Sequence, residues 1–94
     1  MSIRFDYIRE YESLLQTTQL QRGYQEFLKF FKHLRVYLEQ ELPGYAFLGG
    51  IMENGMDYSY FQFTGGALRE QGLKIVIAYV HKTCSLEVWL SGVN

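Results

Sequence analysis

The feature that most constrains the fold is a change in the spacing of apolar residues at Pro43-Gly44. Before this point, apolar side chains recur every three or four residues, which places them on one face of a helix. After it, short runs rich in β-branched and aromatic residues alternate with turn residues, as is typical of strands. Proline ends a helix because it lacks a backbone N–H and its ring clashes with the preceding turn. The sequence therefore predicts an α+β chain with its long helices first.

Two helices are predicted before Pro43-Gly44. Residues 2–17 have charged side chains opposite an apolar stripe made of Tyr7, Tyr11, Leu14 and Leu15. Residues 20–41 form a longer helix with a wider stripe made of Leu20, Tyr24, Phe27, Leu28, Phe31, Leu34 and Leu38. Because the connector between them is short, we expect the two helices to lie antiparallel.

Four strands and one short helical turn are predicted in the remainder of the chain. The strands cover residues 45–52, 57–64, 73–80 and 85–90, and the helical turn covers 67–71. Asn54-Gly55 is a strong hairpin signal because both central positions of a type I′ turn need positive φ. The predicted fold is a single α+β domain over residues 1–94, with two N-terminal antiparallel helices packed on a four-stranded, mainly antiparallel sheet in the order α-α-β-β-α-β-β.

The turn at Asn54-Gly55 also predicts which side chains share a face of the sheet. A two-residue turn pairs Met52 with Asp57 and Leu48 with Phe61. One face then carries Ala46, Leu48, Met52, Phe61 and Phe63, and the other carries Phe47, Ile51, Met56, Tyr58 and Tyr60. Both faces are apolar or aromatic, whereas a strand with one solvated face should alternate with polar residues.

The second hairpin extends both faces. An even-numbered loop at Lys82-Thr83 predicts a core face made of Ile75, Ile77, Tyr79, Leu86, Val88 and Leu90. The opposite face carries Val76, Ala78, Val80 and Trp89, with Lys74 and Glu87 among them. Since the helices are expected to cover one face, the face rich in Tyr and Trp needs another cover.

The candidate binding residues all belong to that second face: Phe47, Ile51, Tyr58, Tyr60, Glu87 and Trp89. Tyr and Trp suit a contact surface because they join a large apolar area to a polar group. A second copy of the chain, giving a homodimer, is the preferred cover. A small ligand, a further segment of chain, or helices divided between the two faces are the alternatives. The preferred function is a small binding or interaction domain; the alternative is a small-molecule-binding protein or enzyme that uses Glu87.

Three segments resemble a family of small uncharacterised bacterial proteins that contain a domain of unknown function: "GMDYSYFQFT", "LKIVIAYVH" and "LEVWLSGVN". The shared pattern is Met-Asp-x-x-Tyr-Phe, then Leu-Lys-Ile-x-Ile, then Glu-x-Trp-Leu-x-Gly-x-Asn. The start of the chain, "FDYIREYESLLQTTQLQRGYQEFLKF", is similar to the helical start of that family. The resemblance implies no activity. Members of the family continue into a charged helical tail, so a longer natural chain would offer a tail as a further cover for the second face.

Composition narrows the classes of partner. The net charge is −1 and no segment forms a basic domain, so nucleic-acid binding is not expected. Cys84 is the single cysteine, which indicates a reducing, cytoplasmic setting without a disulfide framework. Two histidines, His33 and His81, are too few for an expected metal site, and no nucleotide-binding motif or other cofactor signal is found. No apolar run is long enough for a membrane span. A binding domain is therefore preferred over an enzyme.

Overall fold

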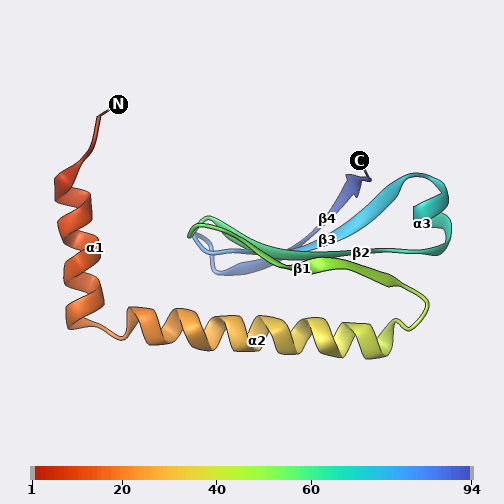
Figure 1. Cartoon of the computed structure of the whole chain (residues 1–94), viewed down its shortest axis with the longest axis horizontal. Coiled ribbons are helices and arrows are strands. Elements are labelled where there is room, and N and C mark those ends of the chain that lie inside the picture. The colour runs from red at the N-terminus through yellow and green to blue at the C-terminus, as the bar shows by residue number, and fades with distance from the viewer. Residues whose placement is uncertain (1, 94) are drawn as a thin grey trace. The chain divides into compact units, whose positions relative to one another are not determined.

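The computed structural model describes residues 2–93. Its elements are α1 (Phe5–Thr17), α2 (Leu20–Glu41), β1 (Ala46–Asn54), β2 (Tyr58–Thr64), α3 (Gly66–Glu70), β3 (Leu73–Val80) and β4 (Ser85–Gly92) (Figure 1). The four strands form one antiparallel sheet in the order β1-β2-β3-β4. The α+β class and the order α-α-β-β-α-β-β confirm the prediction made from the sequence.

The chain divides into two compact units, residues 1–33 and 34–94, with the boundary inside α2. In the first unit, α1 ends where the hydroxyls of Thr17 and Thr18 donate to the carbonyl oxygens of Ser13 and Leu14. The Thr18 hydroxyl also accepts a hydrogen bond from the backbone N–H of Leu20 at 3.3 Å, so the same residue begins α2.

The apolar stripe of α1 stays open. No residue of α1 is buried, and Tyr7, Tyr11 and Leu14 are all exposed. In α2, by contrast, the ring of Phe31 is fully buried and stacks on Phe27 with centroids 5.4 Å apart. The antiparallel packing of the two helices, and the extent of the domain over residues 1–94, therefore stay predictions.

The first hairpin differs from the predicted register. Its loop has three residues, 55–57, because Asn54 pairs with Tyr58 and the carbonyl oxygen of Asn54 accepts from the Asp57 N–H at 3.1 Å. Further along the strand, Gly49, Gly50 and Ile51 of β1 lie opposite a single residue of β2, which forms a bulge with Gly49 at φ +62°. Glycine adopts this left-handed conformation without a Cβ penalty.

The changed register moves the β1 side chains that pair with β2 to the opposite face from the one predicted. Phe47 pairs with Phe63, so Phe47 shares the face of Phe61 and Phe63. Ala46, Leu48 and Met52 lie on the side of Tyr58 and Tyr60 instead. A period of two makes this unavoidable, since a slip of one residue in pairing reverses the whole strand.

The second hairpin confirms the prediction. Ile75 pairs with Leu90, Ile77 with Val88 and Tyr79 with Leu86, across a loop of residues 81–84. Glu87 lies opposite Ala78, as expected from the even loop. The sheet therefore has two faces. The Phe face carries Phe47, Phe61, Phe63, Ile75, Ile77, Tyr79, Leu86, Val88 and Leu90. The Tyr/Trp face carries Ala46, Leu48, Met52, Tyr58, Tyr60, Val76, Ala78, Glu87 and Trp89.

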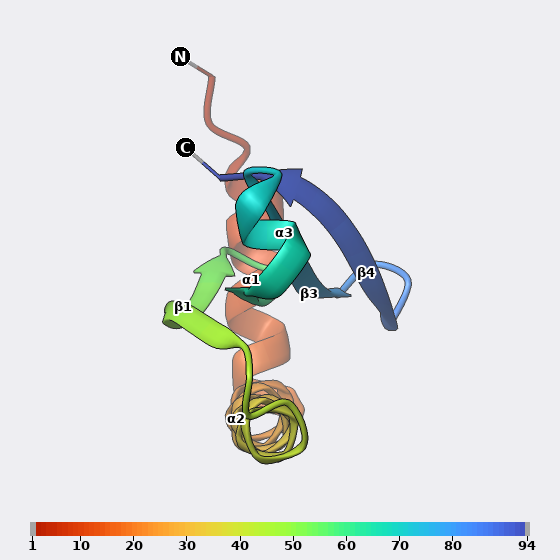
Figure 2. The same ribbon diagram turned by 90° about the vertical axis from the view of Figure 1, so that its right-hand side faces the viewer.

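The core occupies only part of the Phe face. Phe61 is fully buried, and Phe47 stacks on it with centroids 6.2 Å apart while the Arg35 guanidinium of α2 lies 5.7 Å from the Phe47 ring. Within the second unit, the C-terminal part of α2 lies beside β1 and away from β4 (Figure 2). A helix is about 10 Å wide, whereas four strands span about 19 Å. A single helix is therefore too narrow to cover the whole face of a four-stranded sheet.

Candidate functional site

The rings of the Tyr/Trp face form one cluster. Tyr58 lies 5.8 Å from Tyr60 and 5.4 Å from Trp89 between ring centroids, the second pair edge to face. Val76 and Ala78 on β3 lie between these aromatic residues in the sheet and are both buried. Small residues on the central strand allow the larger neighbouring rings to cover it, so this face is shielded in part by its own side chains.

Glu87 has a partner within the same strand. The indole Nε1–H of Trp89 donates to Glu87 Oε1 at 2.9 Å, because residues two apart on a strand point to the same face. Both residues lie on the edge strand β4, where Glu87 is exposed and Trp89 is half-buried. The carboxylate thus orients the indole of Trp89.

A shallow hollow lies beside the ring cluster. It measures about 180 Å³ and is lined by Tyr58, Tyr60, Val76, Trp89 and Ser91. Small-molecule pockets usually measure about 300–1,000 Å³. The hollow therefore has room for a single ring, and three of its lining residues, Tyr58, Tyr60 and Ser91, carry a hydroxyl group. Glu87 does not line it.

The structure brings together four of the six candidate residues: Tyr58, Tyr60, Glu87 and Trp89. Phe47 was placed wrongly, because the three-residue loop shifts the pairing by an odd number of residues and turns Phe47 to the Phe face, where its ring packs 4.9 Å from that of Phe63. Ile51 lies within the bulge and has no partner in the β1–β2 ladder.

His81 lies at the same end of the sheet as Glu87 but acts on the other face. Its Nε2 is 3.0 Å from the Oγ of Ser59, which is fully buried, and its ring meets Tyr79 edge to face at 5.1 Å. The Phe face thus contains a buried hydroxyl whose hydrogen bond is satisfied. A shared acid–base role for His81 and Glu87 has no geometric support, because they belong to opposite faces.

The chemistry of the remaining polar groups is sparse. Cys84 is free and exposed, and its Sγ donates to the carbonyl oxygen of His81 at 3.4 Å. Among residues 2–93, no group of three or more His, Cys, Asp or Glu side chains is placed to hold a metal ion. No helix in this described range is both long and apolar enough to cross a membrane.

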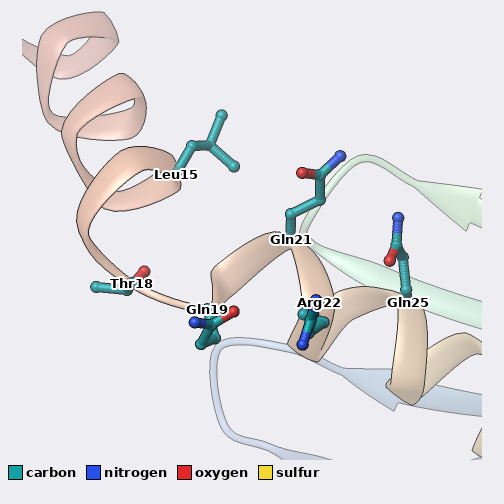
Figure 3. Close-up of a pocket in the computed structure, with 6 residues that line it drawn as sticks. All are labelled: Leu15, Thr18, Gln19, Gln21, Arg22 and Gln25. Atoms are coloured by element: carbon teal, nitrogen blue, oxygen red, sulfur yellow. The ribbon is translucent and has the colours of Figure 1, made fainter.

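A second concavity lies where α1 meets α2. It measures about 370 Å³ and is lined by Leu15, Thr18, Gln19, Gln21, Arg22 and Gln25. Figure 3 shows these side chains pointing in different directions. A binding site needs polar groups that converge on a ligand, so this concavity is the outer surface of the junction between two helices.

The most exposed apolar surface of the sheet is one that the sequence predicted to be core. We call Leu86, Val88 and Leu90 the β4 stripe; their exposed fractions are 49%, 69% and 63%. These side chains share the Phe face with fully buried Phe61. Alternation along β4 correctly placed them on one face. The signal that could have indicated their exposure is width: a four-stranded sheet is wider than one helix, so a single helix leaves part of the face uncovered.

The fold and these surfaces define a small α+β domain with two aromatic or apolar surfaces and no recognisable catalytic centre among its described residues. The family model described as "Domain of unknown function (DUF7000)" matches residues 5–94. The chain therefore belongs to the DUF7000 family. Neither the curated proteins nor the solved structures include a match to it.

Proposed function

We propose that this chain is a protein-interaction domain that assembles with a second copy of itself in the bacterial cytoplasm. The observation that carries the proposal is the β4 stripe, three large apolar side chains in a row that are each at least 49% exposed. A contiguous exposed apolar patch of this kind marks a contact surface. The single cysteine fits a reducing compartment, and the bacterial setting comes from the family resemblance described above.

The size of the β4 stripe determines how much free energy it can contribute to dimer formation. Fully burying one Leu or Val side chain stabilises by roughly 1.5–3 kcal/mol, so the exposed parts of two stripes together contribute on the order of 8 kcal/mol. Association itself costs about 4–15 kcal/mol. The stripe alone is therefore marginal, and a stable dimer needs a further contact.

The open face of α1 offers such a contact. Its stripe from Tyr7 to Leu14 is about 10 Å long at 1.5 Å per residue. The β4 stripe from Leu86 to Leu90 is about 13 Å long at 3.3 Å per residue. A helix of 13 residues is marginal in water without a packing partner. We propose that α1 of each copy packs on the β4 stripe of the other.

The test is the mass of the chain in solution. Sedimentation equilibrium at micromolar concentration should give twice the monomer mass for the native chain and the monomer mass for Val88→Lys. Met52→Lys is the matched control: Met52 is 50% exposed, lies on the other edge strand and belongs to the Tyr/Trp face. A native monomer contradicts the proposal. Dissociation by the control alone would move the interface to the Tyr/Trp face.

A second function, binding of a small aromatic ligand, is favoured by the hollow beside Tyr58, Tyr60 and Trp89. Tyr rings and an indole at its wall suit stacking or edge-to-face contact with one ring. Trp89 is the single tryptophan, so its fluorescence reports on this hollow. Saturable quenching by phenol in the native chain, lost in Tyr60→Leu, is the expected result. Linear, unsaturable quenching would remove this candidate.

A further inference from the structure

We infer that β4 pairs antiparallel with β4 of the second copy, so that two four-stranded sheets join into one continuous sheet. The inference rests on the proposed self-association and states how the two copies meet. Three observations carry it: the direction of the backbone groups of β4, the lack of protection along its edge, and the symmetry of its sequence.

A backbone hydrogen bond just past the end of the β3–β4 ladder shows which backbone groups of β4 point away from β3. Val93 N–H donates to the carbonyl oxygen of Gly72 at 2.8 Å, one step beyond the Leu73–Gly92 pair. In an antiparallel ladder, pairs of opposite residues that exchange backbone hydrogen bonds alternate with pairs that do not. The residues of β4 that bond to β3 are therefore Ser85, Glu87, Trp89 and Ser91.

The backbone N–H and C=O groups of the β4 stripe consequently point away from the sheet. The same parity follows on the other side of β3, where His81 N–H donates to the carbonyl oxygen of Asp57 at 2.9 Å, one step beyond the Tyr58–Val80 pair. Each of Leu86, Val88 and Leu90 thus presents an outward donor, an outward acceptor and an exposed side chain. A strand that docks there meets both kinds of contact at the same residues.

The edge of β4 lacks the usual protection against pairing. Natural edges are blunted by bulges, prolines, short length or charged side chains. β4 has eight residues without proline and pairs regularly with β3 along its length. Its single charge, Glu87, is turned to the Tyr/Trp face and bonded to Trp89. The opposite edge, β1, carries the bulge at Gly49.

The sequence of β4 is complementary to itself under a two-fold axis. With the axis at Val88, Leu86 of one copy lies beside Leu90 of the second copy, and the two Val88 residues meet. Glu87 then faces Trp89 of the second copy, so no like charges are directly opposed. Three hydrogen-bonded pairs, each exchanging two bonds, give about six backbone hydrogen bonds. These features identify a second copy as the strand that docks.

Chemical ligation at Cys84 allows a test at a single backbone atom. Residues 1–83 as a thioester are joined to a synthetic peptide of residues 84–94 that carries an N-methyl group on Val88. This change keeps the Val88 side chain and the β3 ladder but removes the outward donor and blocks the edge. The dissociation constant measured by sedimentation should rise at least about tenfold relative to the ligated native sequence. Circular dichroism of both products is the check that each of them is folded.

A disulfide arm keeps the inference testable if the methylated chain folds poorly. In Cys84→Ser/Val88→Cys, the two introduced thiols lie on residues about 5.5 Å apart between Cα atoms, which is within disulfide range. Mild oxidation should therefore give a covalent dimer. Cys84→Ser/Met52→Cys, with similar exposure on β1, should give little.

The outcomes separate the two proposals. A dimer that survives N-methylation and forms no disulfide at Val88 overturns strand pairing but leaves self-association intact. A monomeric ligated native chain overturns both. An N-methyl effect together with cross-linking at Val88 supports both.

Discussion

The hydroxyl of Ser59 lies 3.0 Å from Nε2 of His81, and this hydrogen bond joins the middle of the sheet to the β3–β4 loop. Ser59 is fully buried, so its hydroxyl is not hydrated and the His81 ring takes the place of a water molecule as its partner. Leaving such a group unpaired costs about 1–3 kcal/mol. The pair therefore holds the hairpin end of the Phe face together.

Removing either partner should destabilise the chain by about 1–2 kcal/mol. Ser59→Ala and His81→Leu each break the hydrogen bond. The double variant loses the same single bond, so its cost is counted one time and not two. We expect the double variant to lose less free energy of unfolding than the sum of the single changes, with a coupling of about 1 kcal/mol in urea denaturation. Strict additivity would show that the two groups do not interact.

Tyr79 should titrate at a higher pH than an ordinary tyrosine side chain. A hydrogen bond with Cys84 and partial burial raise the pKa of Tyr79 above its ordinary value of 10.0. Because the folded state favours the neutral phenol, the stabilisation is present below pH 10.0 and is lost as the pH rises through the folded pKa. Cys84→Ala should lower the pKa of Tyr79, as measured from ring carbon chemical shifts. An unchanged titration would exclude the Cys84 contribution.

Gly65 should be the glycine least tolerant of a side chain. A Cβ there would lie 3.1 Å from the backbone oxygen of Gly44 and 3.1 Å from Cδ1 of Tyr45. Gly65→Ala should cost about 1–3 kcal/mol, because the α3 entry and the β1 entry must move apart. Gly50→Ala, with no atom within 4 Å, is the control and should have a smaller effect on thermal unfolding. Equal losses would contradict the close approach.

Two glycines should respond to alanine with opposite signs. Gly23 lies inside α2 with open space around it, so Gly23→Ala should stabilise by about 1 kcal/mol through helix propensity. Gly49 has φ +62°, so Gly49→Ala should destabilise by about 1–2 kcal/mol despite equal space. Urea denaturation measures both. A shared sign would show that backbone conformation does not decide the outcome.

Adjacent residues of β2 should separate core from surface. Phe61 is fully buried beside Phe47, so Phe61→Asp places an unpaired charge in the core and should abolish cooperative unfolding. Tyr60 lies on the Tyr/Trp face, and Tyr60→Asp should leave a folded chain with the mass of a dimer. Loss of the dimer in Tyr60→Asp would instead favour the Tyr/Trp face as the interface.

The predictability of each hairpin followed from its loop. The β3–β4 register was predictable because the even spacing between Val80 and Ser85 fixes which residues oppose each other. The β1–β2 register was not, because Asn54-Gly55 permits more than one loop length and the structure has three residues there. The bulge at Gly49 adds a change of pairing that two adjacent glycines suggest but do not locate.

The candidate surfaces divide in a similar way. Alternation within β2 and β4 placed Tyr58, Tyr60, Glu87 and Trp89 on one face, because that pattern is local. The exposure of Val88 was not predictable, since alternation reports which side chains share a face and not whether a helix covers them. Coverage depends on the width and position of helices, which are properties of the assembled layers.

The bulge in β1 bears on how large an assembly can become. Filaments grow when every subunit accepts a neighbour at each of its ends. Here one edge, β4, has a regular row of outward backbone groups, while Gly49, Gly50 and Ile51 interrupt the row on β1. A subunit with a single accepting edge is saturated after one encounter. Gly49 and Gly50 lie on the edge opposite to the proposed contact, and the bulge that contains them would thus prevent β4 pairing from continuing into a fibre.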